Sequence, residues 1–131
     1  MQDNEILKDL FFIERGFLNG NHFVYRSDAP ILIDTAYVSD FRQTEKSIAR
    51  LGVNLTDIAL IISTHTHCDH IGGNHRIQQK SGCDIALHKV GKYFIDSRDD
   101  WATWWRYYNQ EAEFFDCTRS LENGEMIPLG P

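Results

Sequence analysis

The sequence contains no long hydrophobic run, since none of its apolar stretches approaches the roughly 20 residues that a membrane-spanning helix needs. Its N-terminal segment mixes charged with apolar residues and has no small-residue cleavage site, so it does not resemble a secretory signal. It has only three cysteines, an odd and scattered set that does not suit a disulfide framework. We therefore expect a cytoplasmic protein with no membrane partner.

Basic residues are also scarce and scattered along the chain. Thirteen Lys and Arg face nineteen Asp and Glu, which gives a formal net charge of −6. Because nucleic-acid binding depends on clustered positive charge, no nucleic-acid partner is expected. The apolar content of 42% and the length of 131 residues suit one globular domain with its own core. We therefore predict a single domain over residues 1–131.

Segments with strand and helix character alternate along the chain. The apolar patterns and turn signals predict strands at residues 11–17, 22–26, 31–34, 58–62 and 84–88, and a turn with a strand within residues 121–130. Apolar residues at helical spacing predict helices at residues 40–51, 74–80 and 101–115. The order strand, helix, strand predicts crossover connections in an α/β sheet, where ligands gather beyond the carboxyl ends of the strands.

Three histidines and an aspartate follow one of these strands within six residues. The segment THTHCDHIGG, residues 64–73, has the spacing H-x-H-x-D-H and ends in two glycines. In an extended or loop backbone, alternate side chains point to the same side, so His65 and His67 can reach one cation. Asp69 shares that parity, and His70 can turn toward a neighbouring position. Imidazole and carboxylate are the ligands of zinc and of non-haem iron, so we predict a metal site.

This segment resembles the H-x-H-x-D-H signature of the metallo-β-lactamase-fold hydrolases. Residues 31–35, ILIDT, resemble an earlier motif of that family, a strand that ends in aspartate. The resemblance runs along nearly the whole chain and favours the glyoxalase II and β-lactamase branches. It implies an α/β fold that forms the N-terminal half of a four-layer αβ/βα sandwich. We expect a single domain that is truncated before the remaining metal-ligand loops.

The resemblance also implies roles for particular side chains. His65 and His67 would hold a first metal ion, and Asp69 and His70 a second. Asp69 would also be catalytic, by keeping the proton of the attacking hydroxide in place. Asp34 would lie behind the ligands and orient a histidine. Two divalent ions are implied, with zinc expected and iron or manganese as alternatives. A third histidine, a bridging aspartate and a final histidine have no match in this sequence.

The implied function is a metal-dependent hydrolase. A metal-bound hydroxide would attack a small-molecule ester, thioester, lactone or β-lactam. One alternative is an iron-dependent oxidoreductase of the same fold, of the persulfide dioxygenase or diiron type. Another is a non-catalytic half-fold that binds a partner or forms a homodimer. With two ligands for each ion, the 131-residue segment is expected to be inactive on its own.

Three further features have their own interpretations. The aromatic segment WATWWRYYNQEAEFF either packs on the core or places Trp104, Trp105 and Tyr108 as a wall of the substrate site. Cys68, inside the motif, has no ligand role in the matching pattern and is expected to be a small buried filler, with a redox-sensitive or outer-shell thiol as the alternative. His22 is expected on the surface of a hairpin or at the rim of the site.

Overall fold

The computed structural model describes residues 4–16, 20–99, 101–102 and 113–129. The strands are β1 (Glu5–Leu7), β2 (Leu10–Ile13), β3 (His22–Tyr25), β4 (Ile31–Ile33), β5 (Leu60–Ile62), β6 (Asp84–His88) and β7 (Arg119–Leu121). The helices are α1 (Phe41–Ala49), α2 (Cys68–Ile71), α3 (Asn74–Ser81) and α4 (Lys89–Asp96), with a 3₁₀ turn η1 (Leu55–Asp57). The predicted α/β class is confirmed.

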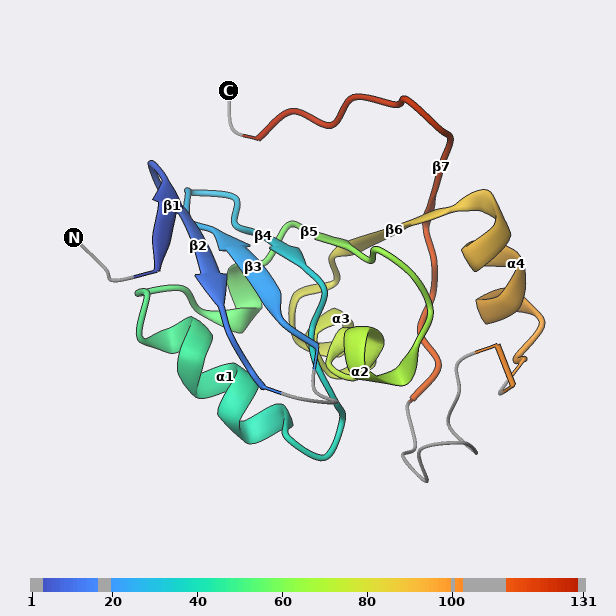
Figure 1. The fold of residues 1–131 in the computed structure, drawn as a ribbon, viewed down its shortest axis with the longest axis horizontal. Coiled ribbons are helices and arrows are strands. Elements are labelled where there is room, and N and C mark those ends of the chain that lie inside the picture. The colour runs from blue at the N-terminus through green and yellow to red at the C-terminus, as the bar shows by residue number, and fades with distance from the viewer. Residues whose placement is uncertain (1–3, 17–19, 100, 103–112, 130–131) are drawn as a thin grey trace.

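The strands form one mixed sheet, in which each strand pairs with its neighbours in the sequence (Figure 1). The pairs from β1 to β4 are antiparallel, and the pairs from β4 to β7 are parallel. The parallel half arises because a helical segment returns the chain to the same edge after β4, β5 and β6. The carboxyl ends of these three strands therefore meet at one edge of the sheet, and the predicted motif follows the middle one.

One face of the sheet packs against the helices. Side chains alternate between the faces of a strand, so Leu32, Ile61 and Ile85 point to the helical side. They join Ile48 of α1 and Ile77 of α3 in the main core cluster, and all five are fully buried. Figure 1 shows α1, α2 and α3 gathered on one side of the strands. No helix of the described residues is long and apolar enough to cross a membrane.

The opposite face of the sheet carries a second, smaller cluster. Ile31, Leu60 and Ala86 are buried there, and the partly buried Ile127 packs on them from the C-terminal segment. Figure 1 draws that segment in red, across the strands from α1, α2 and α3. Within the described residues, the sheet therefore has one face covered by helices and one face on which the C-terminal segment packs.

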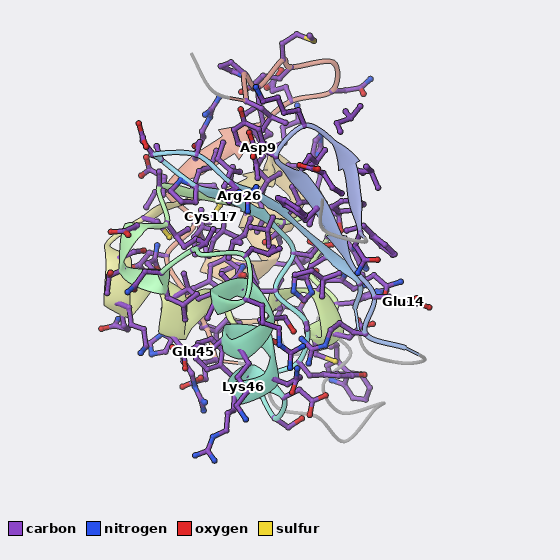
Figure 2. The ribbon with its side chains drawn as sticks, turned by 90° about the vertical axis from the view of Figure 1, so that its left-hand side faces the viewer. Asp9, Glu14, Arg26, Glu45, Lys46 and Cys117 are labelled. Carbon is purple, nitrogen blue, oxygen red and sulfur yellow. The ribbon has the colours of Figure 1, made fainter. Side chains whose placement is uncertain are left out.

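An ion pair joins the β1–β2 turn to the segment after β3, at the end of the sheet away from the motif. Arg26 follows β3 and lies 3.2 Å from a carboxylate oxygen of Asp9 in the β1–β2 turn (Figure 2). The guanidinium also donates to the carbonyl oxygen of Leu51, at 3.2 Å. Because the Asp9 and Arg26 side chains are partly exposed, the ion pair contributes about 1 kcal/mol at most. It ties the antiparallel half of the sheet to the end of α1.

Several elements differ from the sequence-based expectations. The strand predicted at 11–17 is β2, which ends at Ile13. Within 121–130 the predicted turn is present at 123–124, but the described residues contain no strand after the end of β7 at Leu121. The helices α2 and α4 and the edge strand β1 were not predicted. α4 begins directly after β6, where the Nδ1 atom of His88 accepts the backbone N–H of Val90 and so caps the helix.

Candidate metal centre

After β5 the chain bends at Thr64 and enters α2, whose N-cap is His67 with extended φ −63° and ψ 144°. The expectation of an extended loop throughout the motif is therefore wrong for its second half, because Asp69 and His70 lie in the helix. Asp69 occupies the first turn, where exposed N–H groups favour a carboxylate. Only glycine fits at Gly72, since a Cβ there would lie 2.2 Å from the carbonyl carbon of Tyr37.

The structure brings the four motif side chains together. The ring centroids of His65 and His67 are 4.6 Å apart, and those of His65 and His70 are 4.1 Å apart. The Asp69 carboxylate lies 3.4 Å from the Nε2 atom of His70. All four side chains are half-buried, so they face a surface that a ligand can reach.

Asp34 supports this cluster through hydrogen bonds from Thr64 and His70. It is buried, and it follows β4 in the left-handed region with φ 63°. One carboxylate oxygen accepts the backbone N–H of Thr64 at 2.8 Å. The other accepts the Thr64 hydroxyl at 2.7 Å and the His70 Nδ1 at 2.8 Å. Left-handed backbone costs a residue other than glycine about 1 kcal/mol or more, and these three hydrogen bonds offset that cost.

A buried polar network fixes the neighbouring segments. The Thr35 hydroxyl donates to Asn74 at 2.7 Å and accepts the backbone N–H of Gly73 at 3.0 Å. The Asn74 amide donates to the Ser63 hydroxyl at 2.9 Å, and the Thr35 N–H donates to the carbonyl oxygen of His70 at 2.9 Å. The network therefore ties β4, the end of β5 and the start of α3 to the motif. Sequence reasoning missed it, since its members are small polar residues with no spacing of their own.

The electrostatic environment shifts the pKa values of the three imidazoles in different directions. Burial, followed by the charge of the neighbouring imidazoles, lowers the pKa of His65. Burial also lowers the pKa of His67. Burial lowers the pKa of His70 as well, but the hydrogen bond and charge of Asp34 and the charge of Asp69 outweigh it and raise that pKa overall. His65 and His67 are therefore held neutral at pH 7, which is the form of imidazole that binds a metal ion.

The loop between β2 and β3 closes on the motif at Gly20. The Gly20 N–H donates to the carbonyl oxygen of Asp69 at 2.9 Å. A Cβ at this position would lie 2.0 Å from that oxygen and 3.1 Å from the Nδ1 atom of His70. Nothing in the sequence indicated that this loop contacts the motif.

His22 corrects a sequence-based expectation. The side chain is fully buried and does not lie on a hairpin surface. Its Nδ1 is 3.5 Å from the carbonyl oxygen of Gly20, and its Nε2 has no hydrogen-bond partner among the described residues. Burial lowers the pKa of His22 to about 4. The alternation of β3 contains the missed signal, because His22 shares the core face with Val24.

The expected substrate wall lies outside the described residues. Trp104, Trp105 and Tyr108 all belong to the part of the chain that the structure does not describe, so their role stays a prediction. The aromatic segment begins close to the motif, because the Thr66 hydroxyl donates to the carbonyl oxygen of Ala102 at 3.2 Å.

The expectation that Cys68 is buried is confirmed. Its side chain is fully buried, and burial raises the pKa of the thiol to about 11. The protein therefore holds it as a neutral thiol, which is a poor nucleophile and a poor metal ligand. Cys83 and Cys117 are also buried and free, so none of the three cysteines forms a disulfide.

Two further observations concern binding sites in the described part of the chain. No three His, Cys, Asp or Glu side chains in it are arranged to hold one metal ion among themselves. A hollow of about 490 Å³ lies between β2 and α1, and its lining includes Phe12, Arg15, Gln43 and Arg50. The residues described around this hollow include no member of the motif, so it is separate from the candidate metal centre.

Known structures share this architecture. BJP-1, a subclass B3 metallo-beta-lactamase of Bradyrhizobium japonicum, has a TM-score of 0.78 and 24% identity, over 93% of this chain and 46% of its own. A metallo-beta-lactamase with a HARLDQ motif from Cronobacter sakazakii has a TM-score of 0.77 and 19% identity, over 95% and 48%. The FEZ-1 metallo-beta-lactamase of Legionella gormanii has a TM-score of 0.75 and 19% identity, over 93% and 47%. The chain therefore spans about half the length of these structures.

These likenesses confirm the predicted fold, the N-terminal half of a metallo-β-lactamase sandwich. No curated protein matches the chain by sequence. The family model of the metallo-beta-lactamase superfamily matches residues 15–126, which include the buried aspartate after β4 and the whole histidine motif. Sequence and fold thus agree over most of the chain, and the protein belongs to the metallo-beta-lactamase superfamily.

Proposed function

We propose that this chain carries part of the active site of a metal-dependent hydrolase. One observation carries the proposal: three imidazoles and one carboxylate gather at the carboxyl edge of the sheet, on one half-buried surface. Structural polar clusters are normally paired internally. Here the Nδ1 atoms of His65 and His70 bond to Thr64 and Asp34, and among the described residues no backbone or hydroxyl group bonds to the Nε2 atom of either ring.

The donor set fits divalent metal ions. Neutral imidazole and carboxylate are the groups that zinc, iron and manganese share. His65 and His67 would hold one ion, and Asp69 and His70 a second. Each pair would need further donors, because a catalytic zinc takes three or more ligands from protein. We propose that residues 1–131 form one domain and that the rest of a longer fold supplies those donors.

The chemistry follows from this arrangement. Bound divalent ions lower the pKa of water and polarise a carbonyl or phosphoryl oxygen, which hydrolysis at neutral pH requires. The partly exposed Asp69 carboxylate would accept the proton of an attacking water molecule. Asp34 and the N–H groups around it fix the imidazoles before a substrate binds, so that little reorganisation accompanies the reaction.

The proposed substrates are small molecules with an ester, thioester, lactone or β-lactam bond. The similar structures are named as metallo-beta-lactamases, which makes a cyclic amide one member of the panel to test. The net charge of −6 does not favour a polyanionic substrate. Zinc is the proposed metal.

Hydrolysis can be tested on the protein in the form that its gene encodes. We expect the zinc-loaded or manganese-loaded protein to hydrolyse at least one member of an ester, thioester, lactone and β-lactam panel. Asp69→Asn should lower that rate by roughly 100-fold or more, since it removes the proton acceptor. Full metal occupancy, measured by elemental analysis, without turnover of any member would contradict the proposal.

A further inference from the structure

The side chain of Thr64 lies between the buried carboxylate and one of the imidazoles. Its hydroxyl oxygen is 2.7 Å from the Asp34 carboxylate and 2.9 Å from the Nδ1 atom of His65. The same carboxylate oxygen also accepts the His70 Nδ1 at 2.8 Å. One carboxylate is thus connected to two histidines of the motif, to one directly and to the other through a hydroxyl.

The direction of each hydrogen bond follows from the donor inventory. A carboxylate only accepts, so the single hydroxyl hydrogen of Thr64 points to Asp34. The hydroxyl oxygen then has only lone pairs to offer His65, and the Nδ1 of His65 must carry the hydrogen. The Nε2 of His65 is left as the atom with a lone pair, and it faces away from this chain of hydrogen bonds.

We propose that Thr64 is a positioning residue, whose hydroxyl relays Asp34 to His65 and fixes both the ring orientation and the Nδ1–H form of that histidine. The inference rests on the proposed function, because its purpose is to present the Nε2 of His65 to a metal ion. Asp34 thereby sets two imidazoles at once. Partners of this kind behind a metal ligand typically contribute 10–100-fold in metal affinity.

One substitution removes the Thr64 hydroxyl and keeps the backbone hydrogen bond of Thr64 to Asp34. The backbone N–H of Thr64 bonds to Asp34 independently of the side chain, at 2.8 Å. Thr64→Val therefore keeps that bond and the side-chain shape, and removes only the hydroxyl. Thr64→Ser keeps the hydroxyl. Thr66→Val is the matched control, since the Thr66 hydroxyl lies two residues away and bonds to Ala102 instead.

The first experiment uses the metal-free protein and long-range ¹H–¹⁵N correlation spectra of the imidazoles. We expect His65 in the Nδ1–H form in wild type, Thr64→Ser and Thr66→Val, and a shift toward the Nε2–H form in Thr64→Val. An Nε2–H form of His65 in wild type would overturn the proposal, and that measurement needs no variant. An unchanged His65 in folded Thr64→Val would overturn it as well.

The second experiment measures the affinity of the same proteins for Zn²⁺ by competition with a chelating dye. Thr64→Val should bind Zn²⁺ about tenfold more weakly or worse, while Thr64→Ser and Thr66→Val should stay close to wild type. Equal affinity of Thr64→Val and wild type would overturn the positioning role. If wild type has the expected form of His65 but binds no Zn²⁺, the proposed function fails while the relay stands.

Discussion

At the scale of single residues, His22 has the least satisfied environment in the described part of the chain. Its imidazole is fully buried, and its Nε2 atom has no hydrogen-bond partner there. A buried polar atom without a partner costs about 1–3 kcal/mol. Burial is also the main reason that the pKa of His22 falls from 6.5 to about 4.

This lowered pKa predicts a pH dependence of stability. Between pH 6.5 and about 4 the unfolded chain binds a proton at His22 that the folded chain does not. The contribution of neutral His22 to the free energy of unfolding is therefore fully present above pH 6.5. It is lost as the pH falls to about 4, and the total loss is about 3 kcal/mol. Urea unfolding at several pH values measures it. His22→Phe should remove this part of the slope, and His75→Gln should keep it. An identical slope in wild type and His22→Phe would contradict the assignment.

Asp34 is the residue on which both orienting contacts depend. Asp34→Asn replaces a carboxylate that accepts three hydrogen bonds by an amide that must donate with one of its two ends. We expect Zn²⁺ affinity to fall by roughly 10–100-fold, and by more than in Thr64→Val, because two histidines lose their orientation. Asp28→Asn, in an exposed turn, is the control. A chelator-competition titration gives both affinities, and equal values would exclude the role of Asp34.

At the scale of elements, the sequence predicted those with a clear pattern. The strand expected at 84–88 is β6, and the helix expected at 74–80 is α3 with one residue more. The elements that were missed are short or weakly patterned. α2 has four residues, which is barely one turn, so no periodicity can reveal it. β1 is a three-residue edge strand whose position depends on pairing with β2.

The sequence predicted the four motif side chains and the supporting Asp34, but not the other contacts that hold the motif in place. The motif indicated the side chains of His65, His67, Asp69 and His70, because histidine and aspartate are common metal ligands and their close spacing is visible in the sequence. The supporting contacts of Gly20 come from a distant loop, and backbone contacts leave no trace in residue spacing. Tertiary packing decides such contacts, so one sequence cannot reveal them.

The approach of the β2–β3 loop to α2 can be tested at Gly20. Gly20→Ala would place a Cβ 2.0 Å from the Asp69 carbonyl oxygen. Both atoms belong to the main chain, so the clash can be relieved only by a shift of the backbone. We expect a loss of roughly 1–3 kcal/mol in the free energy of unfolding, together with weaker Zn²⁺ binding, since the start of α2 must shift. Thermal unfolding and metal titration measure the two effects.

Gly82→Ala is the matched control for this prediction. Gly82 ends α3 with φ +70°, and a Cβ there would meet no atom within 4 Å. The substitution should cost roughly 1 kcal/mol through backbone strain and leave Zn²⁺ binding unchanged. If Gly20→Ala behaved like Gly82→Ala in both assays, the close approach of the loop to the motif would be wrong.

At the scale of the whole molecule, the two faces of the sheet contribute unequally to stability. The helical face holds a large buried cluster, and the other face holds three buried residues with a few partly buried neighbours. Ile48→Ala on the helical side should cost about 2–5 kcal/mol, because it opens a cavity in a fully buried site. Ile127→Ala on the other side should cost about 1 kcal/mol or less.

Urea denaturation of the two variants compares these losses directly. The dominance of the helical face predicts a clearly lower midpoint for Ile48→Ala than for Ile127→Ala. Equal losses would mean that the C-terminal segment is as strongly held as the helices. The comparison matters for function, because α2, which carries Asp69 and His70, packs into the core on the helical side through Cys68 and Ile71.

The central claim is that the H-x-H-x-D-H side chains form a metal-binding surface. Titration of the ¹⁵N-labelled protein with Zn²⁺, followed through the imidazole signals, tests it most directly. The account predicts that the signals of His65, His67 and His70 shift together, while those of the other three histidines stay unchanged. It would be contradicted if the three motif histidines kept their signals at saturating Zn²⁺, or if all six histidines shifted equally.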